Sequence, residues 1–372
     1  MRTGWRLVLV PVALVALPVM WSHAMAATEV VTHVVAKEKQ AAAVAHWTRA
    51  RIAAAPAMQL QLDKGSGLVS LAELAREGTS GPSGSSPSGA ADPSADQIAE
   101  MAYWSDWAVL NEEARALPLD DGAPLGTFGV YTSFDVNKQT QVWKVFPHKA
   151  MGKLTFSTGA GSASCSATSL SGNNFVTAAH CVFDTAANRF YSNWVFTPAY
   201  RNGTAPYGTF AATACTVLTA WVNLPGTYAI STHVKYDVAV CTAGKNSAAQ
   251  TLNAAVGFLG RSWDQGYQQL IFDMGYPAKT YTGAPISVGP AQYLRACVAE
   301  TFQYTTDTMG MGCDWGAGIS GAPWVRVYKM FVAGASNYVN SVVSGGFTGQ
   351  PNVYGIRFTS SNIVPICTAR GC

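Results

Sequence analysis

The sequence predicts an all-β domain over residues 126–372, mainly because short apolar runs alternate there with turn residues. Runs rich in β-branched and aromatic residues, separated by Gly, Asn, Pro and Ser, are typical of a β-sandwich or a β-barrel. The whole chain is 49% apolar and 12% charged, which provides enough apolar side chains for a sizeable core. The predicted strands cover residues 129–134, 141–146, 175–178, 194–197, 215–222, 237–241, 270–274, 324–327 and 353–358.

The first 26 residues are predicted to be a signal peptide. Arg2 and Arg6 precede an apolar run over 7–20, and the small residues of Ala24-Met25-Ala26 follow it. The run is short for a membrane span and contains two prolines, so a cleaved signal is favoured over a retained anchor. We therefore expect a secreted or periplasmic protein that has no membrane contact after cleavage.

Residues 27–125 differ in composition from the rest of the chain and are predicted to be a pro-region. An alanine-rich stretch over 29–55 favours helix. Residues 78–93 are rich in Gly, Ser and Pro, which predicts a flexible linker. Beyond it, apolar residues recur every three or four positions from Tyr103 to Leu117, which predicts a helix that packs one face against the downstream domain.

The two parts of the chain carry opposite charge, although the net charge of the whole is only +3. Residues 27–125 hold 7 Lys/Arg against 13 Asp/Glu, a net −6, and residues 126–372 hold 15 against 8, a net +7. Opposite charges favour an interaction between these two parts of the chain. We therefore interpret the pro-region as an intramolecular inhibitor of the domain over 126–372. No basic cluster is evident, so a nucleic-acid partner is not expected.

All eight cysteines lie after residue 160, and an even number in an exported chain predicts disulfide bonds. The residues alone do not select one pairing. A zinc site is the alternative, but the chain has no tight Cys-x-x-Cys or Cys/His cluster, so we expect no metal and no cofactor. The cysteines are Cys165, Cys181, Cys215, Cys241, Cys297, Cys313, Cys367 and Cys372.

A glycine-dense turn over residues 316–324 contains Ser320. Such a turn leaves a hydroxyl with little steric cover, and glycine lets neighbouring backbone N–H groups converge on one point. Acyl transfer needs that combination of an exposed nucleophile and donors for an oxyanion. An ordinary surface turn is the alternative, because Gly, Ser and Pro are common in turns.

Two upstream motifs supply a candidate base and a candidate carboxylate. An apolar run over 175–181 ends in His180 and Cys181, and a second run over 236–240 begins with Tyr236-Asp237. Histidine, aspartate and serine thus occur in one of the chain orders known for catalytic triads.

Together these motifs resemble those of the chymotrypsin-fold serine endopeptidases, specifically the secreted bacterial trypsin-like and V8-like (glutamyl endopeptidase-like) branch. The resemblance rests on residues 177–181, 236–240 and 313–323 and extends over about 126–372, with Ile319 and Ala322 where relatives usually differ. It implies two six-stranded antiparallel β-barrels, over about 126–250 and 251–372, with the site in the cleft between them. It also implies a Cys165–Cys181 disulfide. For the other cysteines we expect sequential pairing: Cys215–Cys241, Cys297–Cys313 and Cys367–Cys372.

The resemblance assigns roles to four residues. His180 would take the proton of Ser320, and Asp237 would hold the imidazole in the right tautomer. The backbone N–H groups of Gly318 and Ser320 would form the oxyanion hole.

Substrate preference is predicted from three residues. Asp314 lies six residues before Ser320, where trypsin-like relatives place a pocket carboxylate that favours Arg or Lys, although the same motif is also a structural signature in this branch. In the V8-like branch, a histidine about fifteen residues after the serine recognises a glutamate side chain of the substrate. This chain has Ala335 and Ser336 in that region and no histidine. We therefore take Asp314, Ala335 and Ser336 as the possible specificity pocket.

The predicted function is a secreted serine endopeptidase that acts on protein or peptide substrates through an acyl-enzyme intermediate. A catalytically silent, protease-like binding module and an esterase with the same triad are the alternatives. Zymogens that mature by ammonium insertion have an aspartate just before the nucleophile, and this chain has Ile319 there. Since isoleucine accepts no ion pair, we expect the oxyanion loop to be formed already and pro-region removal to uncover the cleft.

Overall fold

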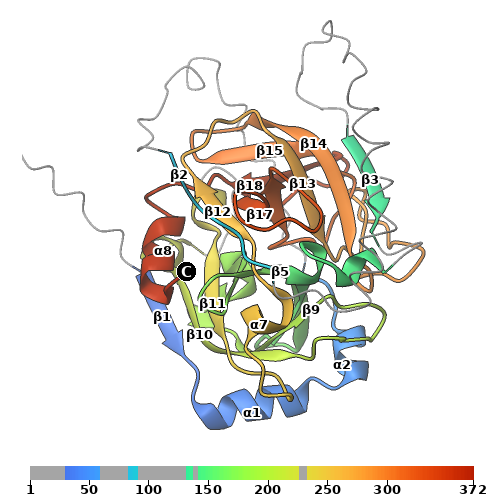
Figure 1. Cartoon of the computed structure of the whole chain (residues 1–372), viewed down its shortest axis with the longest axis vertical. Helices are drawn as coiled ribbons and strands as arrows, with labels where there is room; N and C mark the ends of the chain where they lie inside the picture. Colours follow the sequence, from blue (N-terminus) through green and yellow to red (C-terminus); the bar gives the residue numbers. More distant parts are fainter. Residues whose placement is uncertain (1–29, 59–82, 91–130, 137–140, 226–232) are drawn as a thin grey trace, which may run out of the picture.

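Two closed β-barrels form the body of the protein (Figure 1). The structure is a computed structural model, and it describes residues 30–58, 83–90, 131–136, 141–225 and 233–372. The first barrel pairs its strands antiparallel in the order β10-β11-β6-β5-β4-β9, and a β9–β10 pairing closes it. Its strands are β4 (Met151–Ser157), β5 (Ser162–Leu170), β6 (Asn174–Thr177), β9 (Ser192–Pro198), β10 (Phe210–Leu218) and β11 (Ala239–Ala243).

The second barrel follows the same plan in the order β16-β13-β14-β15-β18-β17, closed by a β16–β17 pairing. The prediction of two six-stranded antiparallel barrels is therefore confirmed. Its strands are β13 (Leu270–Gly275), β14 (Arg295–Gln303), β15 (Thr308–Gly312), β16 (Pro323–Arg326), β17 (Tyr338–Gly345) and β18 (Asn352–Ile356). Other strands of this sheet lie outside the closed path, among them β3 (Tyr131–Asp135), which pairs with β14, and β12 (Gly260–Trp263), which runs parallel to β17.

The other elements of residues 141–372 are short. They are β7 (Phe183–Asp184), β8 (Arg189–Phe190), the 3-10 helices η1 (Val142–Lys144), η2 (His148–Ala150), η3 (Ala179–Cys181) and η4 (Val234–Tyr236), and the α-helices α5 (Thr219–Val222), α7 (Leu252–Val256) and α8 (Ile363–Arg370). The strand predicted over 141–146 is wrong, because η1 occupies its centre. Pro147 follows directly and has no N–H to give to a strand partner. No helix of the described residues combines the length and apolar character needed to cross a membrane.

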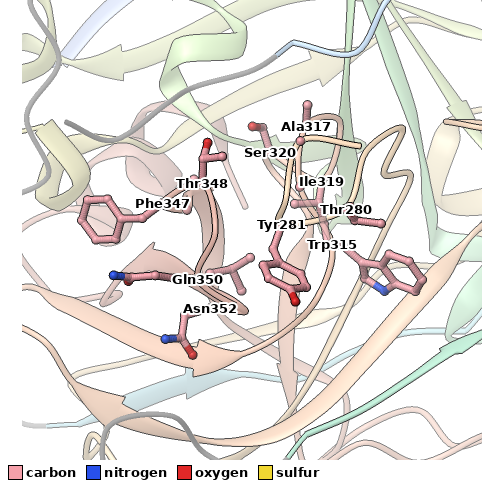
Figure 2. A pocket seen from close by; sticks show the side chains of 15 residues that line it. Thr280, Tyr281, Trp315, Ala317, Ile319, Ser320, Phe347, Thr348, Gln350 and Asn352 are labelled. Atoms are coloured by element: carbon pink, nitrogen blue, oxygen red, sulfur yellow. The ribbon is translucent and has the colours of Figure 1, made fainter. Parts of the chain in front are cut away.

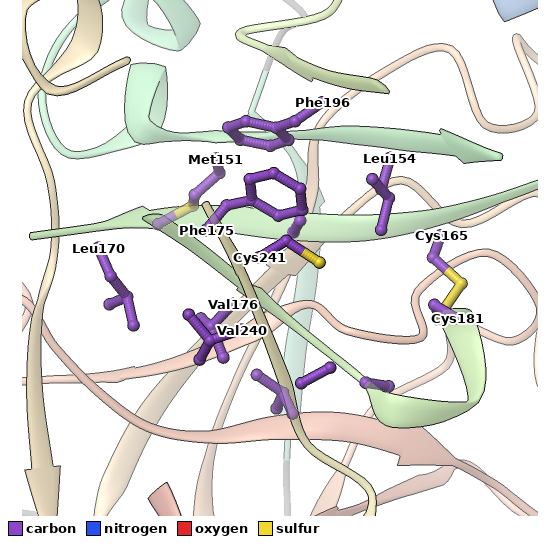
Figure 3. Close-up of a cluster of buried hydrophobic side chains, with 14 of the residues drawn as sticks. Met151, Leu154, Cys165, Leu170, Phe175, Val176, Cys181, Phe196, Val240 and Cys241 are labelled. Atoms are coloured by element: carbon purple, nitrogen blue, oxygen red, sulfur yellow. A yellow bond between two sulfur atoms is a disulfide. The ribbon is translucent and has the colours of Figure 1, made fainter. Parts of the chain in front are cut away.

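The core of the first barrel is a cluster of large side chains from facing strands (Figure 3). Phe175 and Phe196 stack with their ring centroids 5.1 Å apart, and Leu154 and Val240 are completely buried beside them. Each fully buried side chain of this size stabilises the fold by about 1.5–3 kcal/mol. This packing holds the strand ends that carry the candidate site.

The start of the predicted pro-region adds a strand and two helices to the first barrel. β1 (Val30–Val34) pairs antiparallel with residues 214–218 of β10, and α1 (Lys37–His46) and α2 (Arg49–Ala54) follow. The helix predicted over 29–55 is thus present only from residue 37 onward. β9 pairs only with residues 210–211 of β10, so the rest of that edge of β10 is free to pair with another strand. β1, which contains three valines and so favours strand, pairs there.

The described part of the predicted flexible linker, residues 83–90, contains a short strand. β2 (Gly84–Ser86) pairs antiparallel with β12, and the backbone of Ser88 pairs with Gly334. A Cβ on Gly84 would lie 2.2 Å from the ring of Trp263, so only glycine lets the chain approach this edge. The predicted signal peptide and the stripe from Tyr103 to Leu117 lie outside the described residues.

Four disulfide bonds join the eight cysteines in the pairing that we predicted: Cys165–Cys181, Cys215–Cys241, Cys297–Cys313 and Cys367–Cys372. Two groups of described residues have metal-ligand spacing, one around Cys165 and Cys181 and one around Cys297 and Cys313. Their sulfur atoms are in disulfides, so they offer no thiolate to a metal. The Cys165–Cys181 bond ties β5 to η3, the turn that carries His180.

Candidate active site

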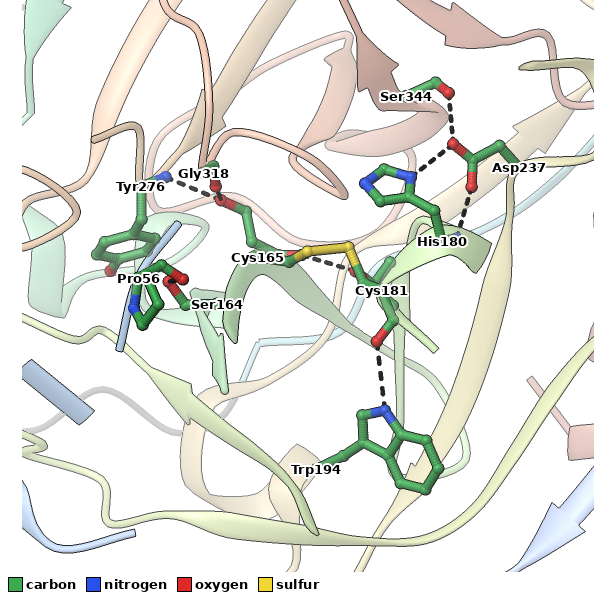
Figure 4. The surroundings of a disulfide bond; sticks show 12 residues. Pro56, Ser164, Cys165, His180, Cys181, Trp194, Asp237, Tyr276, Gly318 and Ser344 are labelled. Atoms are coloured by element: carbon green, nitrogen blue, oxygen red, sulfur yellow. Dashed lines mark hydrogen bonds and ion pairs between the residues drawn. A yellow bond between two sulfur atoms is a disulfide. The ribbon is translucent and has the colours of Figure 1, made fainter. Parts of the chain in front are cut away.

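His180 and Asp237 come together because His180 follows one strand, Asp237 precedes another, and the two strands are paired. His180 lies in η3 just after β6, Asp237 lies just before β11, and the two strands pair in the first barrel. The His180 Nδ1 and Asp237 Oδ2 atoms are 2.8 Å apart, and the His180 backbone N–H donates to Oδ1 at 2.9 Å (Figure 4). Both oxygens of this buried carboxylate therefore hold the histidine, which fixes its ring orientation.

A third residue, Ser344, reaches the same carboxylate from the second barrel. Its hydroxyl, at the end of β17, donates a hydrogen bond to Asp237 Oδ2 (Figure 4). Burial alone would raise the pKa of Asp237, but the charge of His180 and the hydrogen bonds from His180 and Ser344 outweigh it and lower that pKa. A lowered carboxyl pKa contributes stability above about pH 4, which is lost as the pH falls through the pKa of the folded state.

Replacing Ser344 by alanine is expected to lower kcat/KM about 10-fold, because a hydrogen bond to a charged group is lost. Without that donor the pKa of Asp237 rises. On acidification, the activity of the variant should therefore begin to fall at a higher pH than that of the wild type. A pH profile of kcat/KM measures both effects. Ser341→Ala removes an equally buried hydroxyl from the same strand and serves as the control. An unchanged acid limb in Ser344→Ala would exclude this positioning role.

The loop that carries Ser320 is clamped onto the first barrel through Ser166 of β5. The Ser166 N–H donates to the Ser320 carbonyl at 2.7 Å, and the Ser166 hydroxyl donates to the Gly318 carbonyl at 2.9 Å. The next residue, Gly321, has φ +79°, and a Cβ there would lie 2.2 Å from Thr177 Oγ1 and 3.0 Å from the Ala178 nitrogen. The serine loop thus contacts the end of β6, close to where His180 begins η3.

Gly318, the second residue predicted for the oxyanion hole, has φ +97°. A Cβ at this position would lie 2.6 Å from the Tyr276 carbonyl oxygen, so the turn requires glycine. The Gly318 N–H donates to the backbone carbonyl of Met58 at 3.1 Å. One of the two predicted oxyanion donors therefore points at a carbonyl oxygen that belongs to the predicted pro-region.

A pocket opens beside Ser320 between the serine loop and the turn that joins β17 to β18 (Figure 2). None of its lining side chains is charged. The lining residues are Thr280, Tyr281, Gly283, Trp315, Gly316, Ala317, Ile319, Ser320, Gly345, Gly346, Phe347, Thr348, Gln350, Asn352 and Val353.

Asp314, Ala335 and Ser336, which we took as possible pocket residues, do not line this pocket. The Asp314 carboxylate accepts a hydrogen bond from Ser133 of β3 at 2.9 Å, and burial raises its pKa. Ala335 and Ser336 lie in the loop between β16 and β17, where the Ser336 hydroxyl donates to the Val332 carbonyl at 3.1 Å. The pocket wall is instead formed in part by residues that follow Ser344. These residues form no motif that sequence analysis would recognise.

Comparisons with known proteins agree with this architecture. No family model matches the chain, and no curated protein matches its sequence. Among solved structures, the protease Anisep from Arthrobacter nicotinovorans is similar at 27% identity and a TM-score of 0.51, over 60% of this chain and 96% of that one. A thermostable serine protease, AL20, from an extremophilic microorganism is similar at 26% identity and a TM-score of 0.50, over 60% of this chain and 97% of that one.

Proposed function

Because this chain has the chymotrypsin-like fold of bacterial serine proteases, we propose that it is a secreted serine endopeptidase whose triad is His180, Asp237 and Ser320. The observation that carries the triad is the buried His180–Asp237 pair beside a clamped, glycine-dense serine loop. The four disulfides support an oxidising compartment, and thus export to the periplasm or the medium.

In this mechanism, Ser320 attacks the substrate carbonyl as His180 takes its proton. Asp237 keeps the imidazole oriented and stabilises the imidazolium. The oxyanion forms within reach of the Gly318 and Ser320 N–H groups, and its collapse expels the amine, which takes the proton from His180. Water then hydrolyses the acyl-enzyme by the same steps, with His180 again as the base.

Two measurements separate this function from its alternatives. A fluorophosphonate probe labels an activated serine, so absence of labelling at Ser320 would favour a silent binding module. Comparing kcat/KM for a peptide and a short-chain ester separates an endopeptidase from an esterase, because the triad alone does not define the acyl group. We expect labelling and a preference for the peptide.

Residues 55–58 support the proposal that the pro-region inhibits this site. The Ser164 N–H donates to the Pro56 carbonyl and the Met58 N–H donates to the Ser164 carbonyl, both at 2.8 Å, so the segment runs parallel to β5 through Ala57. The next contact is the bond from Gly318 to the Met58 carbonyl. A phosphonyl or substrate oxygen needs the same Gly318 N–H, so it competes with Met58.

The segment before Met58 is fixed to both barrels. β1 pairs with β10, and the Trp47 indole N–H donates to the Asn193 carbonyl at 2.6 Å. The buried Lys153 Nζ donates to the Ile52 carbonyl at 2.9 Å, and burial lowers the pKa of this lysine to about 8. The Gln292 side chain of the second barrel donates to the Ala53 carbonyl at 2.8 Å. Hydrogen bonds and packing, beyond the opposite net charges of the two parts, thus hold this segment in place.

Met58→Pro in the full chain is expected to speed fluorophosphonate labelling of Ser320 about 2-fold to 10-fold. Proline lacks the N–H that Met58 donates to Ser164, and one such hydrogen bond is worth about 0.5–1.5 kcal/mol. Met58→Ala removes the side chain but keeps the N–H, so it is the matched control. Equal labelling rates in the wild type and Met58→Pro would count against inhibition by this segment.

A further inference from the structure

Residues 49–58, which we call the covering segment, bury a lysine of the first barrel. Lys153 of β4 is completely buried, and its Nζ donates to the Ile52 carbonyl, in the last turn of α2, at 2.9 Å. The same nitrogen lies 5.3 Å from the centre of the Tyr200 ring. Lys153 pairs across the sheet with Ser166, the residue that clamps the serine loop. The covering segment therefore buries this lysine on the strand next to that clamp.

No carboxylate pairs with this ammonium group among the described residues. The elements around Lys153 are β4, β5, β9 and α2, and none of them contains Asp or Glu. α2 instead adds the like charges of Arg49 and Arg51. β13 also contacts β4, but its Asp273 lies 3.8 Å from the Cys313 sulfur and forms no ion pair with the lysine.

Two tyrosines also lie beside the lysine, and both keep their protons. Tyr200, whose ring lies under the ammonium group, donates its hydroxyl hydrogen to Gln292 Oε1 at 2.6 Å. Tyr276 packs edge-on against Tyr200, and burial raises the pKa of both tyrosines. One backbone carbonyl and the face of one aromatic ring are thus the partners of the Lys153 charge.

This environment favours a neutral lysine, because a buried ammonium group loses its hydration and one carbonyl oxygen returns only part of that loss. Burial lowers the pKa of Lys153 from the usual 10.5 to about 8. When the covering segment leaves, the nitrogen loses the Ile52 carbonyl and meets water, so its pKa returns toward the usual value. A pKa that is lower in the covered state means that covering releases a proton. The segment is therefore held more tightly as the pH rises from about 8 toward about 10.

We propose that Lys153 makes inhibition by the covering segment depend on pH. The segment is held weakly while Lys153 is charged, near neutral pH, and more tightly once the lysine is neutral, under alkaline conditions. The proposal rests on the proposed function, because it describes how the site of that serine endopeptidase is regulated. A neutral medium thus favours release of the segment and exposure of the Gly318 N–H.

The first test follows fluorophosphonate labelling of Ser320 in the full chain between about pH 7.5 and 9.5. Lys153→Met buries a side chain of similar length without a charge, so its labelling rate reports how the triad and the probe respond to pH. We expect the wild-type rate, divided by the Lys153→Met rate, to fall about 5-fold to 20-fold over this range. A constant ratio would overturn the proposal.

Two further variants identify the titration of Lys153 as the cause. Lys153→Arg keeps a donor for Ile52 but stays charged throughout, so its rate relative to Lys153→Met should not change with pH. Lys329→Met removes an exposed lysine from the loop between β16 and β17 and should keep the wild-type dependence. A wild-type dependence in a folded Lys153→Arg variant would exclude the assigned role.

Amide hydrogen exchange tests the hold without any chemistry at Ser320. In Ser320→Ala, the Met58 N–H, which donates to the Ser164 carbonyl, reports each opening of the covering segment. Comparison with the same chain carrying Lys153→Met, at each pH, cancels the intrinsic exchange rate. Between about pH 7.5 and 9.5, relative protection of Met58 should rise about 5-fold to 20-fold.

The two measurements separate this proposal from the proposed function. A rise in protection, in a protein whose wild type is never labelled, would retain the pH-dependent hold and reject the protease. Labelling of Ser320 with no rise in protection would do the reverse.

Discussion

Replacing Ser320 by alanine is expected to lower peptide hydrolysis about 10⁴-fold to 10⁶-fold and to abolish fluorophosphonate labelling. The change removes one hydroxyl oxygen from a residue that is 4% exposed, so the melting temperature should stay close to that of the wild type. His180→Ala should lose a comparable amount of activity. Because triad members act as a unit, the double variant should be scarcely slower than either single one.

The measurement is kcat/KM on one peptide, with thermal unfolding recorded for each variant. Ser262→Ala removes a completely buried hydroxyl from β12, away from the site, and controls for the loss of a buried serine. Appreciable labelling or turnover in Ser320→Ala would refute the assignment of the nucleophile. Additive losses in the double variant would argue that Ser320 and His180 do not work together.

Gly318→Ala is expected to lower kcat about 10²-fold to 10³-fold, the usual effect of losing one oxyanion donor. Alanine is strained at φ +97°, and its Cβ would lie 2.6 Å from the Tyr276 carbonyl oxygen, so the turn must shift and its N–H with it. The same clash should also lower the melting temperature. Rate and stability are therefore expected to fall together in this variant.

Gly334→Ala is the matched control. Gly334 has φ +90°, and a Cβ there would meet no atom within 4 Å. It carries the same backbone strain without the clash and does not line the pocket. Its melting temperature should fall by less than that of Gly318→Ala, with kcat unchanged. A similar loss of kcat in both variants would attribute the effect to stability and not to the oxyanion donor.

Ile319 bears on how the site is switched on. Its side chain is 2% exposed in the apolar core of the second barrel, beside Ala322 and Trp324. The Gly318 N–H already donates to a carbonyl oxygen, that of Met58. We therefore expect removal of residues 55–58 to uncover a formed turn, with no ammonium group needed to build it.

Much of the fold and the reactive residues was predictable because their signals are local. Apolar runs such as 175–178 predict strands by themselves, and a nucleophile turn needs its glycines in the adjacent positions. The barrel strands β4, β5, β14, β15 and β17 were missed. β5, for example, consists mostly of Ser, Ala and Thr and shows no alternation. β4 and β5 are buried on both faces because α2 and residues 55–58 cover their outer face, as the Lys153–Ile52 and Ser164–Pro56 bonds show.

By itself, the sequence determined that residues 126–372 form an all-β domain and which histidine, aspartate and serine are the candidates for catalysis. The two barrels and the Cys165–Cys181 bond were expected only from the family resemblance. Only the tertiary structure decided what surrounds them. Ser344 reaches Asp237, Lys153 reaches Ile52 and Met58 meets Gly318 across long stretches of chain. These contacts use a lone hydroxyl, a lone ammonium group or a backbone carbonyl, which almost any segment offers. Their partners depend on how the closed barrels bring distant strand ends together, so no local pattern encodes them.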